Sequence, residues 1–121
     1  MQRRQRIDKI GPTRKYSSKQ EKDVASKFSG VQTLNSGATP YQKSDVLLDK
    51  WALECKTKIS DSKSISIQEE WLDKNEKESL YMGKPYSALV FNFGPNKKNY
   101  YIIDEYLFKD LVEYLENKPT S

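Results

Sequence analysis

The sequence contains no histidine and only one cysteine among its 121 residues. The absence of histidine excludes a Ser-His catalytic triad and a zinc site with histidine ligands. The single cysteine, Cys55, excludes a disulfide bond within the chain. No apolar run approaches the length that spans a bilayer and no signal peptide is recognisable, so we expect a cytoplasmic protein that does not insert into a membrane.

The length is that of one domain with a single hydrophobic core, and no internal repeat is visible. A second catalytic half would therefore have to come from another subunit. The composition divides the chain into a flexible basic N-terminal arm over residues 1–16 and one folded domain over residues 17–118.

Positive charge is concentrated at the N-terminus, where residues 1–20 carry seven basic residues against Asp8 alone. Such a cluster suits a DNA backbone, because bound Lys and Arg release counterions; the alternative is a solvated tail. No zinc finger or helix-turn-helix is recognisable, so we expect contacts to phosphates rather than bases. The candidate DNA-binding residues, which include two lysines of a later polar loop, are Arg3, Arg4, Arg6, Arg14, Lys15, Lys58 and Lys63.

Hydrophobic periodicity predicts an α/β fold with the element order helix, three strands, helix, two strands, helix. The first helix should run from Ser17 or Ser18 to about Phe28, with Val24, Ala25 and Phe28 inward. The expected strands cover residues 31–34, 44–48, 51–56, 86–93 and 100–103.

Two further helices follow from their capping signals. Ser66 and Glu69 have capping-box spacing, so the second helix should start at Ser66 and end near Met82. Asp104 should cap the last helix. The side chains expected to face inward are Ile67, Trp71, Leu72 and Met82 on the second helix, and Leu107, Phe108, Leu111, Val112 and Leu115 on the last.

The most informative stretch is residues 44–56, which reads as two strands joined by a turn at Asp49-Lys50. Alternation along the second strand places Glu54 and Lys56 on one face and Cys55 on the other. An antiparallel hairpin brings Asp45 towards Glu54. A right-handed crossover would then place the strand from Tyr86 parallel to the one that carries Glu54.

Two carboxylates and a lysine on one face are suited to metal-dependent phosphodiester hydrolysis. Mg²⁺ prefers oxygen ligands, which Asp45, Glu54 and the backbone carbonyl of Cys55 would supply; Mn²⁺ should substitute. Lys56 would orient or deprotonate the attacking water, or stabilise the transition state. Glu21 extends the inward stripe of the first helix by one turn and could hold a water or a second ion.

Each residue also has a structural interpretation. Glu54 and Lys56 taken alone would be a surface ion pair, Asp45 a polar residue at a strand start, and Glu21 an ordinary helix residue. For the residues taken as a group, the structural interpretations are less convincing. Several acids near one point of an apolar framework would lower the stability of the folded state unless a cation balanced their charge.

Glu21, the Ser36-Gly37-Ala38 loop, Asp45 and Glu54-Cys55-Lys56 resemble the PD-(D/E)xK nuclease superfamily, and within it the archaeal-type and phage-encoded Holliday junction resolvases. The resemblance spans residues 18–93 and implies a restriction-endonuclease-like core, α-β-β-β-α-β, followed here by a strand and a helix. Ser44 stands where the motif has proline.

The resemblance implies a Mg²⁺-dependent homodimer that cuts opposed strands of a four-way DNA junction. Asp45 and Glu54 would be metal ligands, Lys56 the catalytic lysine, Glu21 the helix carboxylate and Ser36 a loop residue near the scissile phosphate. A phage-encoded enzyme of this kind would act in the host cytoplasm. Nicking, repair and other structure-specific nucleases use the same core, and a non-catalytic DNA-binding module on that fold is a further alternative.

Overall fold

The computed structural model describes residues 18–33, 44–58 and 60–119. The predicted basic arm lies outside these residues, and so do several candidate site residues, namely Arg3, Arg4, Arg6, Arg14, Lys15 and Ser36.

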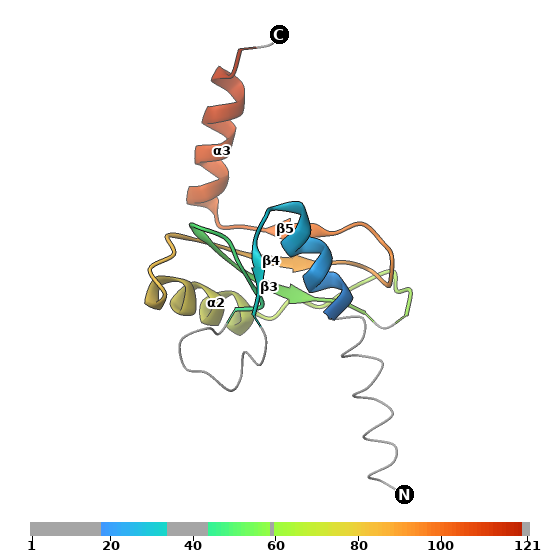
Figure 1. The fold of residues 1–121 in the computed structure, drawn as a ribbon. Coiled ribbons are helices and arrows are strands. Elements are labelled where there is room, and N and C mark those ends of the chain that lie inside the picture. The colour runs from blue at the N-terminus through green and yellow to red at the C-terminus, as the bar shows by residue number, and fades with distance from the viewer. Residues whose placement is uncertain (1–17, 34–43, 59, 120–121) are drawn as a thin grey trace, which may run out of the picture.

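The chain has an α/β fold whose elements follow the predicted order (Figure 1). None of its described helices is long and apolar enough to cross a membrane. After a first helix over residues 18–27, the elements are β1 (Val31–Gln32), β2 (Val46–Leu47), β3 (Trp51–Lys56), α2 (Glu69–Tyr81), β4 (Tyr86–Phe91), β5 (Tyr100–Ile102) and α3 (Glu105–Asn117).

The five strands form one mixed sheet in the order β1-β2-β3-β4-β5. β2 and β3 pair antiparallel, which confirms the predicted hairpin, and the N–H of Leu48 donates to the carbonyl of Trp51 across its turn. β3 and β4 pair parallel, as predicted, with Glu54 beside Leu89. The carboxyl ends of these two central strands therefore lie at the same edge of the sheet.

The two faces of the sheet are covered by different helices. Val24 and Ala25 of the first helix pack on Leu53, Cys55 and their neighbours in β4, which together form the buried core. Glu54 and Lys56, which alternate with these residues along β3, face α2 instead. Alternation along a single strand thus separates the apolar core from the candidate site.

Polar side chains attach α2 to the sheet. The buried Asn75 amide donates to the carbonyls of Ala52 on β3 and Ala88 on β4, and its oxygen accepts from the hydroxyl of Ser44 at 2.7 Å. Ser79, one turn later, donates to the carbonyls of Lys84 and Tyr86. These bonds fix the helix along both central strands. Ser44, where the motif has proline, is a buried structural residue.

The first helix ends at a turn, Ser29-Gly30, that packs closely against the β2-β3 hairpin. Ser29 adopts a φ of 54°, and the N–H of Gly30 donates to the carbonyl of Ala25. A Cβ on Gly30 would lie 2.9 Å from the carbonyl oxygen of Leu47, so only glycine fits there. Phe28, predicted to face inward, is 48% exposed and contacts the Tyr101 ring edge-on.

The prediction that the second helix starts at Ser66 is wrong. Helix α2 begins at Glu69, and its N-cap residue, Gln68, makes no capping hydrogen bond through its side chain. The capping-box spacing marked an exposed stretch rather than a helical turn, because Ser66 lies outside the helix. The fully buried positions of α2 are Asn75 and Ser79, and Trp71, Leu72 and Met82, which the pattern predicted to face inward, lie on the same side and are half-buried.

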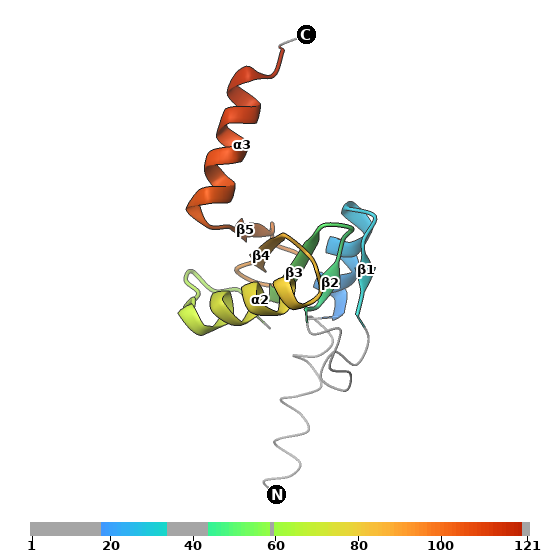
Figure 2. The same cartoon turned by 90° about the vertical axis from the view of Figure 1, so that its left-hand side faces the viewer.

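The capping of α3 is as predicted, but its packing is not. Asp104 accepts from the N–H of Leu107 at 2.9 Å. The helix nevertheless stands away from the sheet (Figures 1 and 2), and none of its residues is buried. Among its predicted inward side chains only Leu107 is half-buried, in a cavity that it lines with residues of α2, β4 and β5, and the inward placement of the others is wrong. The exposed members include Phe108, Leu111, Val112 and Leu115.

Asn75→Ala should lower the free energy of unfolding by about 2 to 4 kcal/mol, because the buried carbonyls of Ala52 and Ala88 and the Ser44 hydroxyl would lose their partner. Urea denaturation measures this change. Lys77→Ala, at an exposed position of the same helix, is the matched control and should change stability by less than about 0.5 kcal/mol. Equal stability of both variants would contradict the role given to Asn75.

Candidate active site

The hairpin makes Asp45 and Glu54 a cross-strand pair. Val46 is in register with Leu53, and the N–H of Asp45 donates to the carbonyl of Leu53 at 3.0 Å. The Asp45 carboxylate accepts from the N–H of Cys55 at 2.8 Å, so this side chain continues the hydrogen-bond ladder beyond the end of β2. One oxygen of Asp45 is thereby fixed at the side of Glu54.

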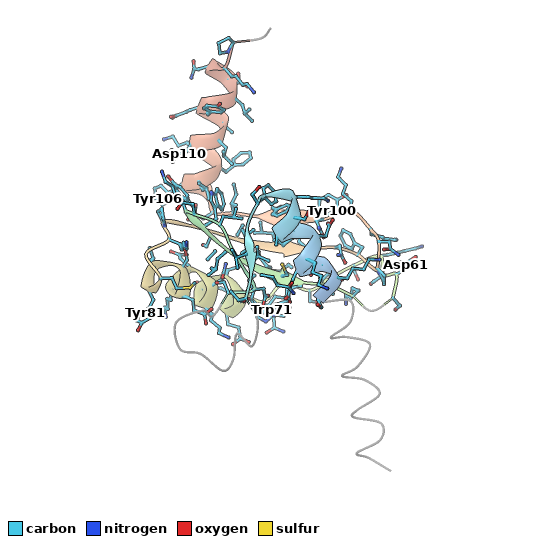
Figure 3. All side chains as sticks on the ribbon, viewed as in Figure 1. Asp61, Trp71, Tyr81, Tyr100, Tyr106 and Asp110 are labelled. Atoms are coloured by element: carbon cyan, nitrogen blue, oxygen red, sulfur yellow. The ribbon has the colours of Figure 1, made fainter. Side chains whose placement is uncertain are left out.

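Lys56 completes the predicted trio. Its Nζ lies 3.7 Å from Oε2 of Glu54 and 4.4 Å from the centroid of the Trp71 ring. A cation over an indole face is attracted by the ring quadrupole. Trp71 projects from the first turn of α2, at the lower edge of the molecule in Figure 3. The ammonium group is therefore held between a carboxylate and an aromatic ring.

Helix α2 supplies further charged groups that sequence reasoning missed. Glu54, Lys56 and Trp71 line a cavity of about 390 Å³ together with Glu70, Lys74, Asn75 and Glu78. Lys74 and Glu78 are also 3.9 Å apart. The spacing of 70, 74 and 78, each four residues apart, could have shown that these residues share one helix face.

Burial perturbs the two carboxylic acids. Desolvation and the neighbouring Asp45 raise the pKa of Glu54 from its ordinary value of 4.5 to about 7, against the opposing effect of Lys56. Desolvation also raises the pKa of Asp45, although the N–H of Cys55 and the Glu54 side chain act in the opposite direction. Two adjacent acids that resist ionisation point to a functional site.

The donor chemistry of this pair fits a divalent cation. Carboxylate oxygens are the ligands that Mg²⁺ prefers, and a bound cation would offset the cost of ionising two buried acids side by side. Across the described ranges, no group of three or more His, Cys, Asp or Glu residues is arranged to hold a metal ion. The protein ligands for one ion would be Asp45 and Glu54, and the role given to the Cys55 carbonyl stays a prediction.

Glu21 belongs to the first helix and lies near Cys55. Its Oε1 accepts from Nε2 of Gln32 on β1 at 3.0 Å. Burial, followed by the charges of Asp45, Glu21 and Glu54, raises the pKa of the Cys55 thiol, which therefore stays protonated. Glu21 thus lies close enough to share an electrostatic neighbour with the carboxylate pair, and its catalytic role stays a prediction.

Lysines gather where the loops after β3 and β4 meet. A cavity of about 350 Å³ there is lined by Lys19 and Lys27 of the first helix, by Lys97 and Lys98, and by several side-chain amides. Lys63, one of the predicted DNA-binding residues, lies beside Lys97 and Lys98 near the Phe93 and Tyr100 rings. Lys58 is half-buried in the intervening loop.

The sequence signal for this cluster is the Lys97-Lys98 pair between Pro95-Asn96 and Tyr100, a loop that sequence reasoning treated only as a turn. Lys27 is paired with Asp23 and Lys97 with Asp61, whereas no acid of the described chain forms an ion pair with Lys19 or Lys98. The cluster is therefore a positive surface at the carboxyl ends of the central strands.

Comparison with protein-family models, curated proteins and solved structures finds no match for this chain. The resemblance to PD-(D/E)xK nucleases rests on the quoted residues alone.

The raised pKa of Glu54 predicts a pH-dependent stability in metal-free buffer with EDTA. A carboxyl group whose pKa is raised on folding contributes stability that is complete below pH 4.5 and is lost as the pH rises to about 7. The shift corresponds to a loss of up to about 3 kcal/mol. Urea denaturation between pH 4 and 8 measures it.

Glu54→Gln should flatten this dependence and make the metal-free protein more stable than the wild type above pH 7. Asp73→Asn, at an exposed position of α2, should leave the slope unchanged. A wild-type stability that does not fall between pH 4.5 and 7 would contradict the burial of the carboxylate pair.

Proposed function

We propose that this chain is a metal-dependent DNA endonuclease that hydrolyses phosphodiester bonds with Asp45, Glu54 and Lys56. The observation that carries the proposal is the buried carboxylate pair formed by Asp45 and Glu54, with the Lys56 ammonium 3.7 Å from Glu54. If Glu54 and Lys56 were only a surface ion pair, their stability would require neither the burial of Glu54 nor the neighbouring Asp45.

Asp45 and Glu54 would hold a Mg²⁺ ion, for which Mn²⁺ should substitute. A bound ion of this kind supplies positive charge to phosphate oxygens and makes water more acidic. The N–H of Cys55 orients Asp45 for this task, because it fixes one carboxylate oxygen at 2.8 Å. Lys56 would orient the attacking water or stabilise negative charge on the phosphate.

Trp71 is proposed as a positioning residue. A lysine side chain has several rotatable bonds, and stacking over the indole restricts its ammonium group to the cavity. Lys74 adds a second positive charge from α2, which lowers the pKa of both carboxylic acids.

DNA is the proposed substrate because positive charge lies near the site. The lysine cluster of residues 19, 27, 63, 97 and 98 adjoins the end of β3 that carries Lys56, and Gln20 of that cavity donates to the Lys56 carbonyl at 2.9 Å. Lysines without a base-reading motif contact phosphates, which every DNA sequence provides.

Within this class we propose branched DNA, above all a four-way junction, as the substrate and a homodimer as the active form. One carboxylate pair makes one incision, so paired incisions in strands of like polarity need two sites related by a twofold axis. A nuclease that acts on nicks, flaps or damaged duplex is the alternative, and a non-catalytic DNA-binding module is the second alternative.

Asp45→Asn, Glu54→Gln and Lys56→Met should each reduce DNA cleavage at least about 100-fold in Mg²⁺, because each removes a ligand or a charge at the reacting phosphate. Initial cleavage rates of a labelled substrate measure this. Asp73→Asn is the control for the acids and Lys77→Met for the lysine, and both should cut at the wild-type rate. Wild-type rates in EDTA, or in Asp45→Asn, would refute the nuclease proposal.

The substrate is tested with a four-way junction, a flap, a nicked duplex and a linear duplex at equal concentration in Mg²⁺. The junction should be cut at least about tenfold faster than the linear duplex. In a four-way junction, two strands of like polarity can reach the two active sites of a twofold-symmetric dimer at the same time. Equal rates on all four substrates would leave an endonuclease that is not a resolvase. Binding without any cleavage in Mg²⁺ or Mn²⁺ would favour the non-catalytic module.

A further inference from the structure

Helix α3 is the part of the fold that the described residues do not cover. It has 13 residues, none of which is buried, and it stands away from the sheet in both views of the ribbon (Figures 1 and 2). A helix of this length is only marginally stable in water on its own. A persistent α3 therefore needs a partner for its apolar face.

That apolar face is a continuous stripe. Leu107, Phe108, Leu111 and Leu115 recur at helical spacing, so their side chains lie on one side of α3. Phe108 is 60% exposed and Leu115 is 63% exposed. Val112 and Tyr114 border the stripe and are also exposed. Helix α3 is thus amphipathic, and its apolar stripe has no partner in the described chain.

The charges around the stripe exclude a polyanion as the partner. Five acids, but only two lysines, lie along residues 104–118. An acidic helix repels a phosphate backbone, so DNA does not cover this face. The remaining candidates are proteins, and the surface must be matched by apolar side chains with suitably placed charges. A second copy of α3 provides both.

We propose that α3 pairs antiparallel with α3 of a second copy of this chain, with a twofold axis through Leu111. This arrangement sets Leu107 opposite Leu115 and Phe108 opposite Tyr114, and it sets Asp104 at one end opposite Lys118 at the other. In a parallel pair Asp104 would face Asp104 and Lys118 would face Lys118, which like-charge repulsion disfavours. Charge complementarity therefore selects the antiparallel orientation.

The root of α3 offers additional apolar surface to the arriving helix end. A cavity of about 260 Å³ lies there between α2, β4, β5 and the first turns of α3, and Leu72, Leu80, Ile102 and Leu107 are among its lining residues. Tyr106 and Asp110 mark its rim at the base of the helix in Figure 3. An antiparallel partner would bring its Leu115 to this end.

The exposed side chains of α3 are the kind that an interface covers. The stripe and its border expose several large apolar side chains, with Phe108, Tyr114 and Leu115 each at least 60% exposed, and a specific interface buries about 1,000 Å² or more in total. The cavity at the root adds to this exposed surface. The pairing does not rest on the proposed nuclease activity, and its test needs neither metal nor DNA.

The pairing is tested by the molar mass in solution, measured by light scattering at micromolar concentrations in EDTA. The wild type should have twice the mass of one chain, and Leu111→Asp should have the mass of one chain with an unchanged sheet core by far-UV circular dichroism. Lys109→Asp, on the opposite face of α3, should stay dimeric. A monomeric wild type, or a dimeric Leu111→Asp, would overturn the proposal.

Disulfide trapping tests the orientation in a protein whose own cysteine is buried. Leu111→Cys should form an interchain disulfide on oxidation, since the twofold axis brings the two positions together. Leu115→Cys should not, because its two copies would lie about 12 Å apart along the axis, beyond disulfide reach. Trapping of Leu115→Cys but not of Leu111→Cys would overturn the antiparallel arrangement.

Discussion

The register between β2 and β3 is the constraint on which the rest of the structure depends. Side chains alternate between the two faces of a strand, so a slip of one residue would turn Glu54 and Lys56 into the apolar core and expose Leu53 and Cys55. The two-residue turn at Asp49-Lys50 and the bond from Cys55 N–H to the Asp45 carboxylate both hold this register. The same contacts place Asp45 beside Glu54, so folding and assembly of the candidate site are one event.

The carboxylate pair costs stability, and the surrounding structure limits that cost. Burial disfavours both ionised acids, while Lys56, Lys74 and the N–H of Cys55 stabilise them in part. The core on the opposite face of β3 and the Asn75 bonds to β3 and β4 provide a rigid support for this site. Two desolvated acids held in place on a rigid support are what a binding or catalytic site needs.

Local patterns in the sequence predicted the hairpin, the parallel β3-β4 pair and the Asp104 cap, because alternation, a two-residue turn and an N-cap act over a few residues. The helix α2 was predicted with the wrong start, and its two fully buried residues, Asn75 and Ser79, were not among those predicted to face inward. Its burial is set by hydrogen bonds from Asn75 and Ser79 to distant strands, which hydrophobic periodicity does not report. The contribution of Trp71 and Lys74 to the site was missed for the same reason, since only the packed helix brings them to Lys56. Periodicity located the apolar stripe of α3 correctly, but the inward placement predicted for most of it was wrong, since the described residues do not supply the surface that it would meet.

Strand β5 separates two surfaces of opposite character. Lys97 and Lys98 precede it beside Tyr100, whereas Ile102 leads through Asp104 into the acidic helix α3. Three residues of extended chain hold these surfaces roughly 10 Å apart along the strand. Because one surface attracts phosphates and the other repels them, DNA bound at the lysines would not compete with a protein partner on α3. The position of β5 therefore keeps the proposed DNA surface and the proposed dimer surface at separate ends of the molecule.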